Sequence, residues 1–219
     1  MVSTKITSSS VAEIDAKLKT FFSPMVKIEY LENCLRQMLP NDASRFCHLM
    51  LAEFYAQRLM YGPAAKNLES AADQSVTFKD KKELYFKEIT YLLKLKDFLM
   101  IDKAFKKALL CGNTNAEKEA VKQFLKHEML ALAAEHEKTN KRSNAVIIYE
   151  RLIDLHITNE VEKKELMAKV ASLNSKMGKI AEAVRYEQMM KLPVSPRKTA
   201  ESDQEVRKVS FSDLGLEEL

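Results

Sequence analysis

The chain has 219 residues, of which 46% are hydrophobic, enough to bury the core of one extended repeat array or one ordinary domain. Its 35 basic and 31 acidic residues leave a net charge of +4, which is too balanced to indicate nucleic-acid binding by itself. Glycine occurs only four times and proline five times, whereas Ala, Leu, Lys and Glu abound, so the composition predicts a nearly all-helical protein.

The cysteine, histidine and glycine patterns favour no metal site, disulfide framework or phosphate-binding loop. Cys34, Cys47 and Cys111 are odd in number and widely spaced, and no Cys-x-x-Cys pair occurs. No histidine has a glutamate three positions before it, and the glycines are scattered. We therefore expect three reduced thiols, no metal, no cofactor and no catalytic residue.

The N-terminal sequence MVSTKITSSSVAEI lacks the apolar run of about 7–15 residues that a signal peptide contains. No stretch approaches the roughly 18 apolar residues of a membrane span. We expect a soluble cytoplasmic protein without a transmembrane segment, with the nucleus as the alternative compartment.

Two helices are expected near the start, after a polar segment, residues 1–9, that we expect to be disordered. Ser10 and Glu13 have the spacing of a capping box, which predicts a helix over residues 11–21. Ser23 and Pro24 fit the N-cap and first position of a helix over residues 24–38, because Pro needs no N–H there. This hairpin lacks a repeat signature, as a capping unit at the end of an array would.

Residues 45–77 show the clearest repeat pattern, two helices folded back on each other through Tyr61, Gly62 and Pro63. Small and apolar residues at helical spacing allow the two helices to approach closely. They are Leu51, Ala52 and Tyr55 in the first helix, and Ala64, Leu68 and Ala71 in the second.

Three further hairpins follow. The first pairs residues 81–95 with 101–110 and ends at Cys111-Gly112, where Gly112 can take the left-handed conformation; Glu88 falls where a large apolar residue is expected. In the second, a capping box at Thr114 and Glu117 opens a helix to residue 138, which pairs with residues 144–156. The third pairs 160–177 with 179–191 through a turn at Gly178. The packing positions are Ala104, then Met129, Leu132, Ala133, Ala145, Tyr149 and Leu152, then Met167, Val170, Ala171, Ala183 and Met190.

These hairpins resemble the tetratricopeptide repeat, which places a large residue, Leu-Gly, Tyr, then Ala, Phe and Pro at fixed positions over about 34 residues. Ala52 stands at the Gly position, Leu68 at the Phe position and Val76 at the Pro position. The alanines in register, Ala64, Ala104, Ala145 and Ala183, lie 40, 41 and 38 residues apart, which indicates elongated helices or loops.

The resemblance implies an all-α fold, a right-handed α-solenoid of about five antiparallel hairpins over residues 10–192. Apolar stripes of period 3.6 fit a compact helical bundle as well, so the bundle stays as the alternative.

Tetratricopeptide arrays that hold the carboxylate ends of chaperone tails carry Lys and Asn at fixed positions of their first helices. The corresponding residues here are Leu49 and Glu53, Ile89 and Leu93, and Leu130 and Ala134. The carboxylate clamp is therefore absent from this chain.

Residues 193–219 are expected to form a flexible tail that carries a linear motif. Arg207, Lys208, Val209 and Phe211 resemble the docking motif by which regulatory subunits bind the catalytic subunit of the type-one protein phosphatase. An extended strand projects residues two apart to the same side, so Val209 and Phe211 can enter paired apolar pockets while the basic pair meets an acidic rim.

Two serines of the tail resemble phosphorylation sites. Ser195 precedes a proline, as in proline-directed kinase sites, and Ser210 follows basic residues inside the docking motif. Phosphorylation of Ser210 would place about −1.5 to −2 charges beside pockets that must be dry.

We therefore expect a non-catalytic adaptor or scaffold that binds a partner segment on its helical-repeat surface and recruits a protein phosphatase through its tail. A helical accessory subunit of a larger complex is one alternative. Binding of nucleic acid or of an anionic membrane through basic faces is another, although no aromatic-basic motif supports it.

Overall fold

The computed structural model describes residues 10–191, and within them the chain forms ten α-helices and no strand. The helices are α1 (Val11–Lys19), α2 (Pro24–Leu35), α3 (Asn41–Gln57), α4 (Tyr61–Asp73), α5 (Phe78–Leu95), α6 (Phe98–Leu110), α7 (Asn115–Lys138), α8 (Arg142–Asp154), α9 (Glu160–Lys176) and α10 (Ile180–Lys191).

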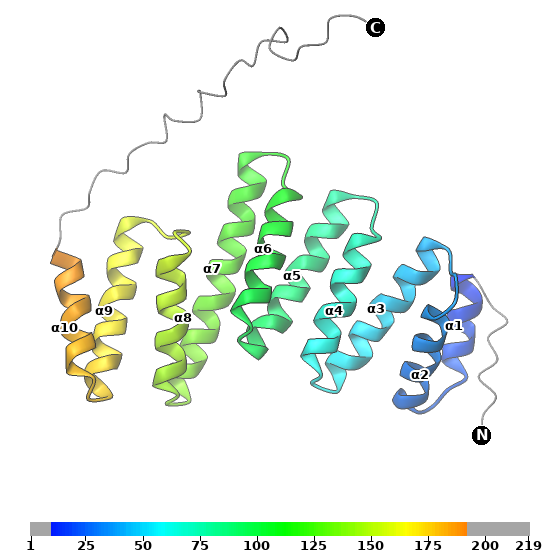
Figure 1. Ribbon diagram of the computed structural model, residues 1–219, viewed down its shortest axis with the longest axis horizontal. Helices are drawn as coiled ribbons and strands as arrows, with labels where there is room; N and C mark the ends of the chain where they lie inside the picture. The colour runs from blue at the N-terminus through cyan, green and yellow to red at the C-terminus, as the bar shows by residue number, and fades with distance from the viewer. Residues whose placement is uncertain (1–9, 192–219) are drawn as a thin grey trace, which may run out of the picture.

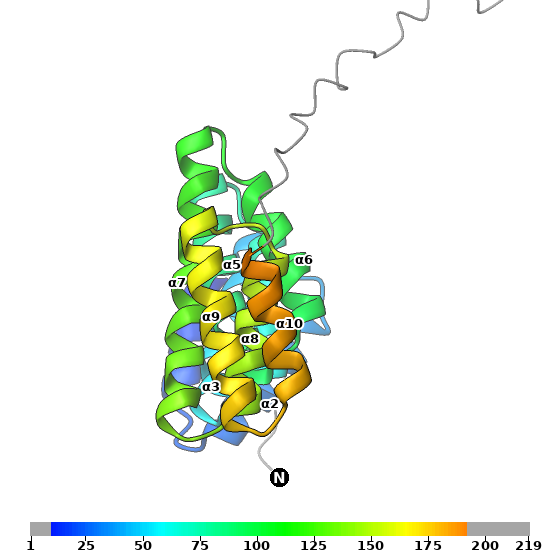
Figure 2. The same cartoon turned by 90° about the vertical axis from the view of Figure 1, so that its left-hand side faces the viewer.

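The hairpins stand side by side in a row, with the first and last helices at opposite ends (Figure 1). Helices in extensive contact are neighbours in sequence, apart from the next-neighbour pairs α1–α3 and α5–α7. Seen from the end of the row, α7 and α9 lie in one layer and α6 and α10 in the other (Figure 2). The molecule is therefore an α-solenoid, in which each hairpin packs only on its neighbours, and not a compact bundle.

Side-chain caps determine where several helices begin. Thr114 Oγ1 accepts a hydrogen bond from Glu117 N at 3.1 Å, and Thr114 N donates to Glu117 Oε2 at 3.3 Å, so the predicted capping box is confirmed. Asn159 and Glu162 form a second complete box, which the sequence analysis did not identify. Thr77 and Asp97 also cap, which starts α5 and α6 three residues earlier than expected.

The turn between α3 and α4 differs from the prediction. Gly62 and Pro63 lie in the first turn of α4, where a missing N–H costs nothing, and the reversal occurs over residues 58–60. Leu59 takes a left-handed φ of 60°, and Met60 N donates to Tyr55 O at 2.9 Å. The turn is closed by backbone hydrogen bonds rather than by glycine.

Two glycines expected in turns have different roles. Gly178 has a φ of 77°, so its left-handed turn between α9 and α10 is confirmed. Gly112 is not among the residues with positive φ, and that expectation was wrong. A Cβ at Gly112 would lie 3.1 Å from Lys118 Cγ and 3.2 Å from Lys118 N, so glycine is needed here for the close approach of α7.

The buried side chains form two clusters that meet at α3. The smaller cluster joins α1 and α2 to α3 and includes Ile14, Leu31 and Leu51. The larger one runs from Ala52 of α3 to Leu173 of α9. Because helix α3 contributes to both, it connects the first hairpin to the rest of the array.

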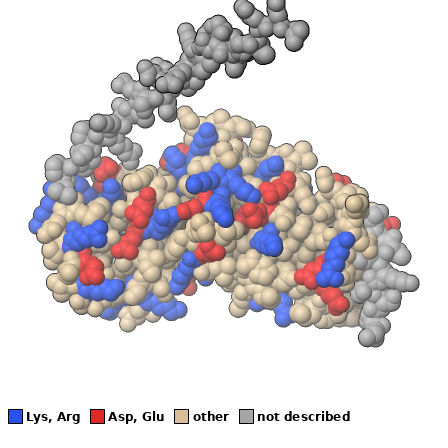
Figure 3. Space-filling view, in the orientation of Figure 1, with Lys and Arg blue, Asp and Glu red and all other residues tan. Residues whose placement is uncertain are grey.

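Polar contacts join successive hairpins in both layers. One set connects α3, α5, α7 and α9 through Arg45–Asp80 at 3.6 Å, Lys82–Glu117 at 3.7 Å and Lys126–Glu162 at 2.8 Å. The other connects α4, α6, α8 and α10 through Glu69–Lys107 at 2.8 Å, Asp102–Arg151, and Glu150–Tyr186 at 2.9 Å. Acidic and basic side chains accordingly lie next to each other across the face in Figure 3.

Candidate protein-interaction surface

A groove between α3 and α5 is the candidate site. It has a volume of about 470 Å³ and is open to solvent. Leu49, Ala52 and Glu53 of α3, Leu68 of α4, and Lys87, Thr90 and Tyr91 of α5 line it. The small side chain of Ala52 and the neighbouring Leu68 are buried and form an apolar floor.

Neighbouring contacts orient the apolar wall of this groove. The rings of Tyr91 and Tyr61 are 5.7 Å apart, and the Lys94 ammonium lies 4.7 Å from the centre of the Tyr61 ring. The Thr90 hydroxyl donates to Phe86 O at 3.1 Å within its own helix. The hydroxyl of Thr90 is thus already engaged, and the groove offers mainly apolar surface.

Two opposite charges flank that apolar surface. Glu53 and Lys87 are exposed on facing helices, and neither forms an ion pair within residues 10–191. The groove can therefore bind an apolar side chain of a partner segment and pair with charged groups on both sides of it.

The tetratricopeptide comparison located this groove only in part. Leu49 and Glu53 line it as that register implies, but Ile89 and Leu93 are buried in the core. The α5 residues in the groove are Lys87, Thr90 and Tyr91, which the sequence analysis did not select. Ala64 and Ala104 are 40 residues apart, whereas the tetratricopeptide repeat has about 34 residues. This difference indicated that the repeat positions do not carry over to α5 without a shift.

The residues proposed for repeat packing lie along the whole array rather than at one site. Ala52 and Leu68 meet at the groove, whereas Tyr55 and Leu132 are half-buried. The buried members are Leu51, Ala52, Ala64, Leu68, Ala71, Ala104, Ala133, Ala145, Tyr149, Ala171 and Ala183. The tail residues Ser195, Arg207, Lys208, Val209, Ser210 and Phe211 lie outside the described residues.

Glu88 of α5 follows the groove residue Lys87 in sequence, but its side chain is buried in the core. Its side chain is 2% exposed, and its Oε2 atom has no hydrogen-bond partner. Burial raises the pKa of Glu88 to about 8, with Glu69 and Asp73 adding to the increase and Lys107 opposing it. Glu88 is therefore held neutral at pH 7 between α4 and α6.

His136 of α7 is a second buried titratable group, and neither of its ring nitrogens is hydrogen-bonded. Burial, together with Lys96 and Lys141, lowers the pKa of His136 and favours the neutral ring. Its neighbours include no pair of ligands, and residues 10–191 contain no group of three or more His, Cys, Asp or Glu side chains that could hold a metal ion. None of the helices in this range is long and apolar enough to cross a membrane.

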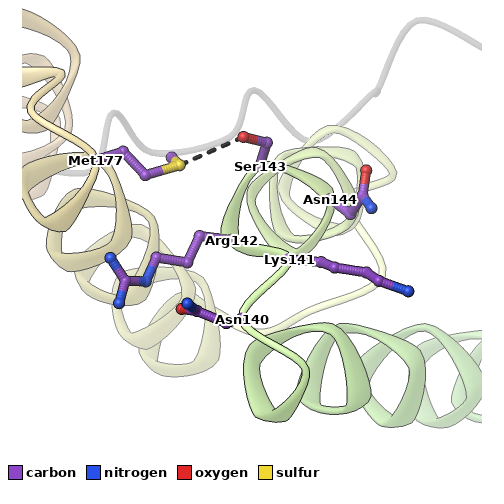
Figure 4. Close-up of a pocket in the computed structure, with 6 residues that line it drawn as sticks. All are labelled: Asn140, Lys141, Arg142, Ser143, Asn144 and Met177. Atoms are coloured by element: carbon purple, nitrogen blue, oxygen red, sulfur yellow. Dashed lines mark hydrogen bonds between the residues drawn. The ribbon is translucent and has the colours of Figure 1, made fainter.

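Another hollow, of about 410 Å³, lies at the turn between α7 and α8. Arg142 Nη1 donates to Lys176 O at 3.1 Å, and the Ser143 hydroxyl donates to Met177 Sδ at 3.4 Å. In Figure 4, Lys141 and Arg142 point in different directions. These side chains do not converge on a common point, so the α3–α5 groove is the better candidate.

No protein-family model matches this chain, and no curated protein is significantly similar to it. Among solved structures, the chain is similar to a MamA RS-1 ArsTM double mutant, with 11% identity, a TM-score of 0.39, and coverage of 84% of this chain and 94% of that chain. A crystal structure of MamA protein gives 15% identity, a TM-score of 0.38, and coverage of 85% and 96%. A human IFIT1 dimer with PPP-AAAA gives 14% identity, a TM-score of 0.28, and coverage of 82% and 45%. Because these scores lie below 0.5, the fold assignment depends on the helices and contacts described above.

Proposed function

We propose that this protein is a non-catalytic interaction scaffold, and that its α3–α5 groove binds an apolar segment of a protein partner. The observation that supports this most is the apolar floor of Ala52 and Leu68 between two unpaired opposite charges, Glu53 and Lys87. Solenoids use such surfaces because neighbouring hairpins present parallel helices to an elongated ligand. The interleaved charges elsewhere favour a protein partner over nucleic acid.

A displayed peptide library selected on the full chain tests this proposal. Enriched peptides should share an apolar anchor next to a charged residue. They should lose at least tenfold in affinity for Leu49→Glu, which places a charge against the apolar floor. The control Ile147→Glu changes an aliphatic residue on α8 that is exposed, whereas Leu49 is half-buried, and this variant should bind the peptides normally. Equal binding by both variants would place the peptide elsewhere and refute the groove.

A second variant tests the groove even if Leu49→Glu fails to fold. Lys87→Glu alters only an exposed side chain, so the array should stay folded by circular dichroism. Peptides with an acidic flanking residue should bind this variant more weakly and recover when that residue is changed to lysine.

Recruitment of a protein phosphatase through the tail is the second part of the proposal. It is supported by the motif residues Arg207, Lys208, Val209 and Phe211 alone. Purified type-one phosphatase catalytic subunit should bind the full chain, and Val209→Ala/Phe211→Ala or phosphorylation at Ser210 should abolish binding. Binding that survives the double substitution would exclude this motif as the docking site.

A further inference from the structure

A larger hollow, of about 760 Å³, lies where the α4–α5 and α6–α7 connections come together. It is lined by Val76, Thr77, Phe78, Lys79, Lys82, Glu83, Phe86, Cys111, Asn113 and Glu117. It shares no lining residue with the α3–α5 groove. The two sites can therefore be perturbed independently.

Two apolar side chains of the lining are largely exposed. Val76 is 95% exposed and Phe78 is 54% exposed. Phe86 is half-buried and stacks on Phe124, with ring centroids 4.1 Å apart. Clustered exposed apolar side chains of this kind indicate a binding surface.

Two basic and two acidic side chains line the hollow, Lys79, Lys82, Glu83 and Glu117, and Lys82 is already paired with Glu117. Lys81 and Lys82 act on Cys111, where they oppose the burial that raises the pKa of that thiol. Glu117 is engaged by the backbone N–H groups of Asn113 and Thr114 and by Lys82. Lys79 forms no ion pair within residues 10–191, so it is available, together with the nearby Lys81, to a carboxylate of a segment that also brings apolar side chains.

The tail of this chain contains such a segment. Residues 212–219, SDLGLEEL, include three leucines and three acidic residues and no basic one. Helix α10 ends at the edge of the array where the α4–α5 and α6–α7 connections also lie (Figure 1).

The chain between α10 and residue 212 is long enough to bring residues 212–219 to the hollow. The residues 192–211 can span up to about 65 Å at about 3.3 Å per residue. Five helix-to-helix steps of about 8–10 Å separate α10 from α5, which carries Phe78, Lys79 and Phe86, so the distance amounts to about 40–50 Å.

We propose that residues 212–219 bind this hollow in the same molecule, with leucines against Val76, Phe78 and Phe86 and with carboxylates beside Lys79 and Lys81. The bound tail would cover the hollow and hold the neighbouring phosphatase-like motif against the array. Binding of residues 212–219 in this hollow does not depend on what the α3–α5 groove binds.

The test uses the full chain, labelled with nitrogen-15, and compares amide NMR spectra of the wild type and Leu216→Ser/Leu219→Ser. The double substitution should shift the amide signals of residues 76–86 and 111–117, because the apolar contacts with the tail are lost. The control Val194→Ser removes an apolar tail residue outside the segment and should leave those signals unchanged. Lys79→Glu/Lys81→Glu, which acts from the other side, should shift the signals of residues 212–219.

Three outcomes would overturn the proposal. The first is unchanged signals at residues 76–86 and 111–117 in the tail variant. The second is shifts that scale with protein concentration, since the segment would then bind a second copy. The third is shifts confined to Leu49, Glu53, Lys87 and Tyr91, which would place the tail in the other groove. Loss of peptide binding by Leu49→Glu concerns only the α3–α5 groove, so the failure of either proposal is recognisable.

Discussion

At the scale of single residues, Glu88 is the clearest departure from an apolar core. Its carboxyl group is buried between Glu69 and Asp73 of α4 and Lys107 of α6, and Tyr85 donates a hydrogen bond to Asp73 beside it at 3.1 Å. Lys107 also pairs with Glu69 at 2.8 Å, so the one cation in this group is shared among several carboxylates. Ionisation of Glu88 would therefore add an unpaired charge to the core.

This arrangement predicts that stability falls as the pH rises from about 4.5 to about 8. Over that range the unfolded chain releases the Glu88 proton and the folded chain retains it, so folding binds protons and weakens with increasing pH. Glu88→Gln should flatten the decrease and be more stable than the wild type at pH 8, by on the order of 3 kcal/mol. Urea unfolding at pH 5 and pH 8 measures both, with Glu83→Gln on the exposed side of α5 as the control. Parallel pH profiles for wild type and Glu88→Gln would contradict the assignment.

At the scale of helices and turns, the two layers are joined by turns of different chemistry. The α9–α10 turn requires a left-handed residue, Gly178, whereas Leu59, Lys96, Asn140 and His156 adopt positive φ without being glycine. The Cβ atom strains each of these residues. In the hairpin turns at Leu59, Lys96 and Asn140, a backbone hydrogen bond from the next residue closes the turn and offsets the strain.

The two glycines Gly178 and Gly62 predict opposite responses to alanine. Gly178→Ala should destabilise the protein by about 1 kcal/mol, because its φ is 77° although no atom lies within 4 Å of the added Cβ. Gly62→Ala should be neutral or stabilise by up to about 1 kcal/mol, since Gly62 is helical and its nearest new contact is Leu95 Cδ1 at 3.8 Å. Thermal unfolding of the two variants gives the sign directly. A Gly178→Ala protein as stable as the wild type would rule out the left-handed turn.

At the scale of the whole molecule, the array has two buried clusters linked by α3 and no long-range closure between its ends. Each hairpin is stabilised by its neighbours only, so local changes should have local effects. The first hairpin, with the smaller cluster, is the part that can open without exposing the core from α4 to α9.

Leu31→Ala should reveal this separation. Leu31 is fully buried in the smaller cluster, and its truncation should cost about 2–4 kcal/mol. Hydrogen exchange should then accelerate in α1, α2 and the start of α3, with little change in α7 and α8. The control Ile148→Ala, in the larger cluster, should have the reverse distribution. Uniform acceleration in both variants would mean that the molecule unfolds as one unit.

Local sequence signals were sufficient for the helical part of the fold. The capping pair Thr114 and Glu117, the turn glycine Gly178 and the apolar stripes each act within one or two helical turns, so they determined element type and number. The reversal at residues 58–60 and the role of Gly112 were predicted wrongly, because backbone hydrogen bonds and the approach of α7 decide them.

The groove was decided only by tertiary packing. Apolar stripes specify that a helix buries one face but do not specify which neighbour covers it, so the stripes alone fitted a bundle as well as a solenoid. The recurrence of Ala64, Ala104, Ala145 and Ala183 favoured the solenoid, and the structure confirms it. The groove combines residues of α3, α4 and α5 that are up to 42 positions apart, from Leu49 to Tyr91. The α5 wall of the groove depends on how that helix is rotated about its axis. Glu88, Ile89 and Leu93 pack inward, and this rotation leaves Lys87 and Tyr91 facing the groove.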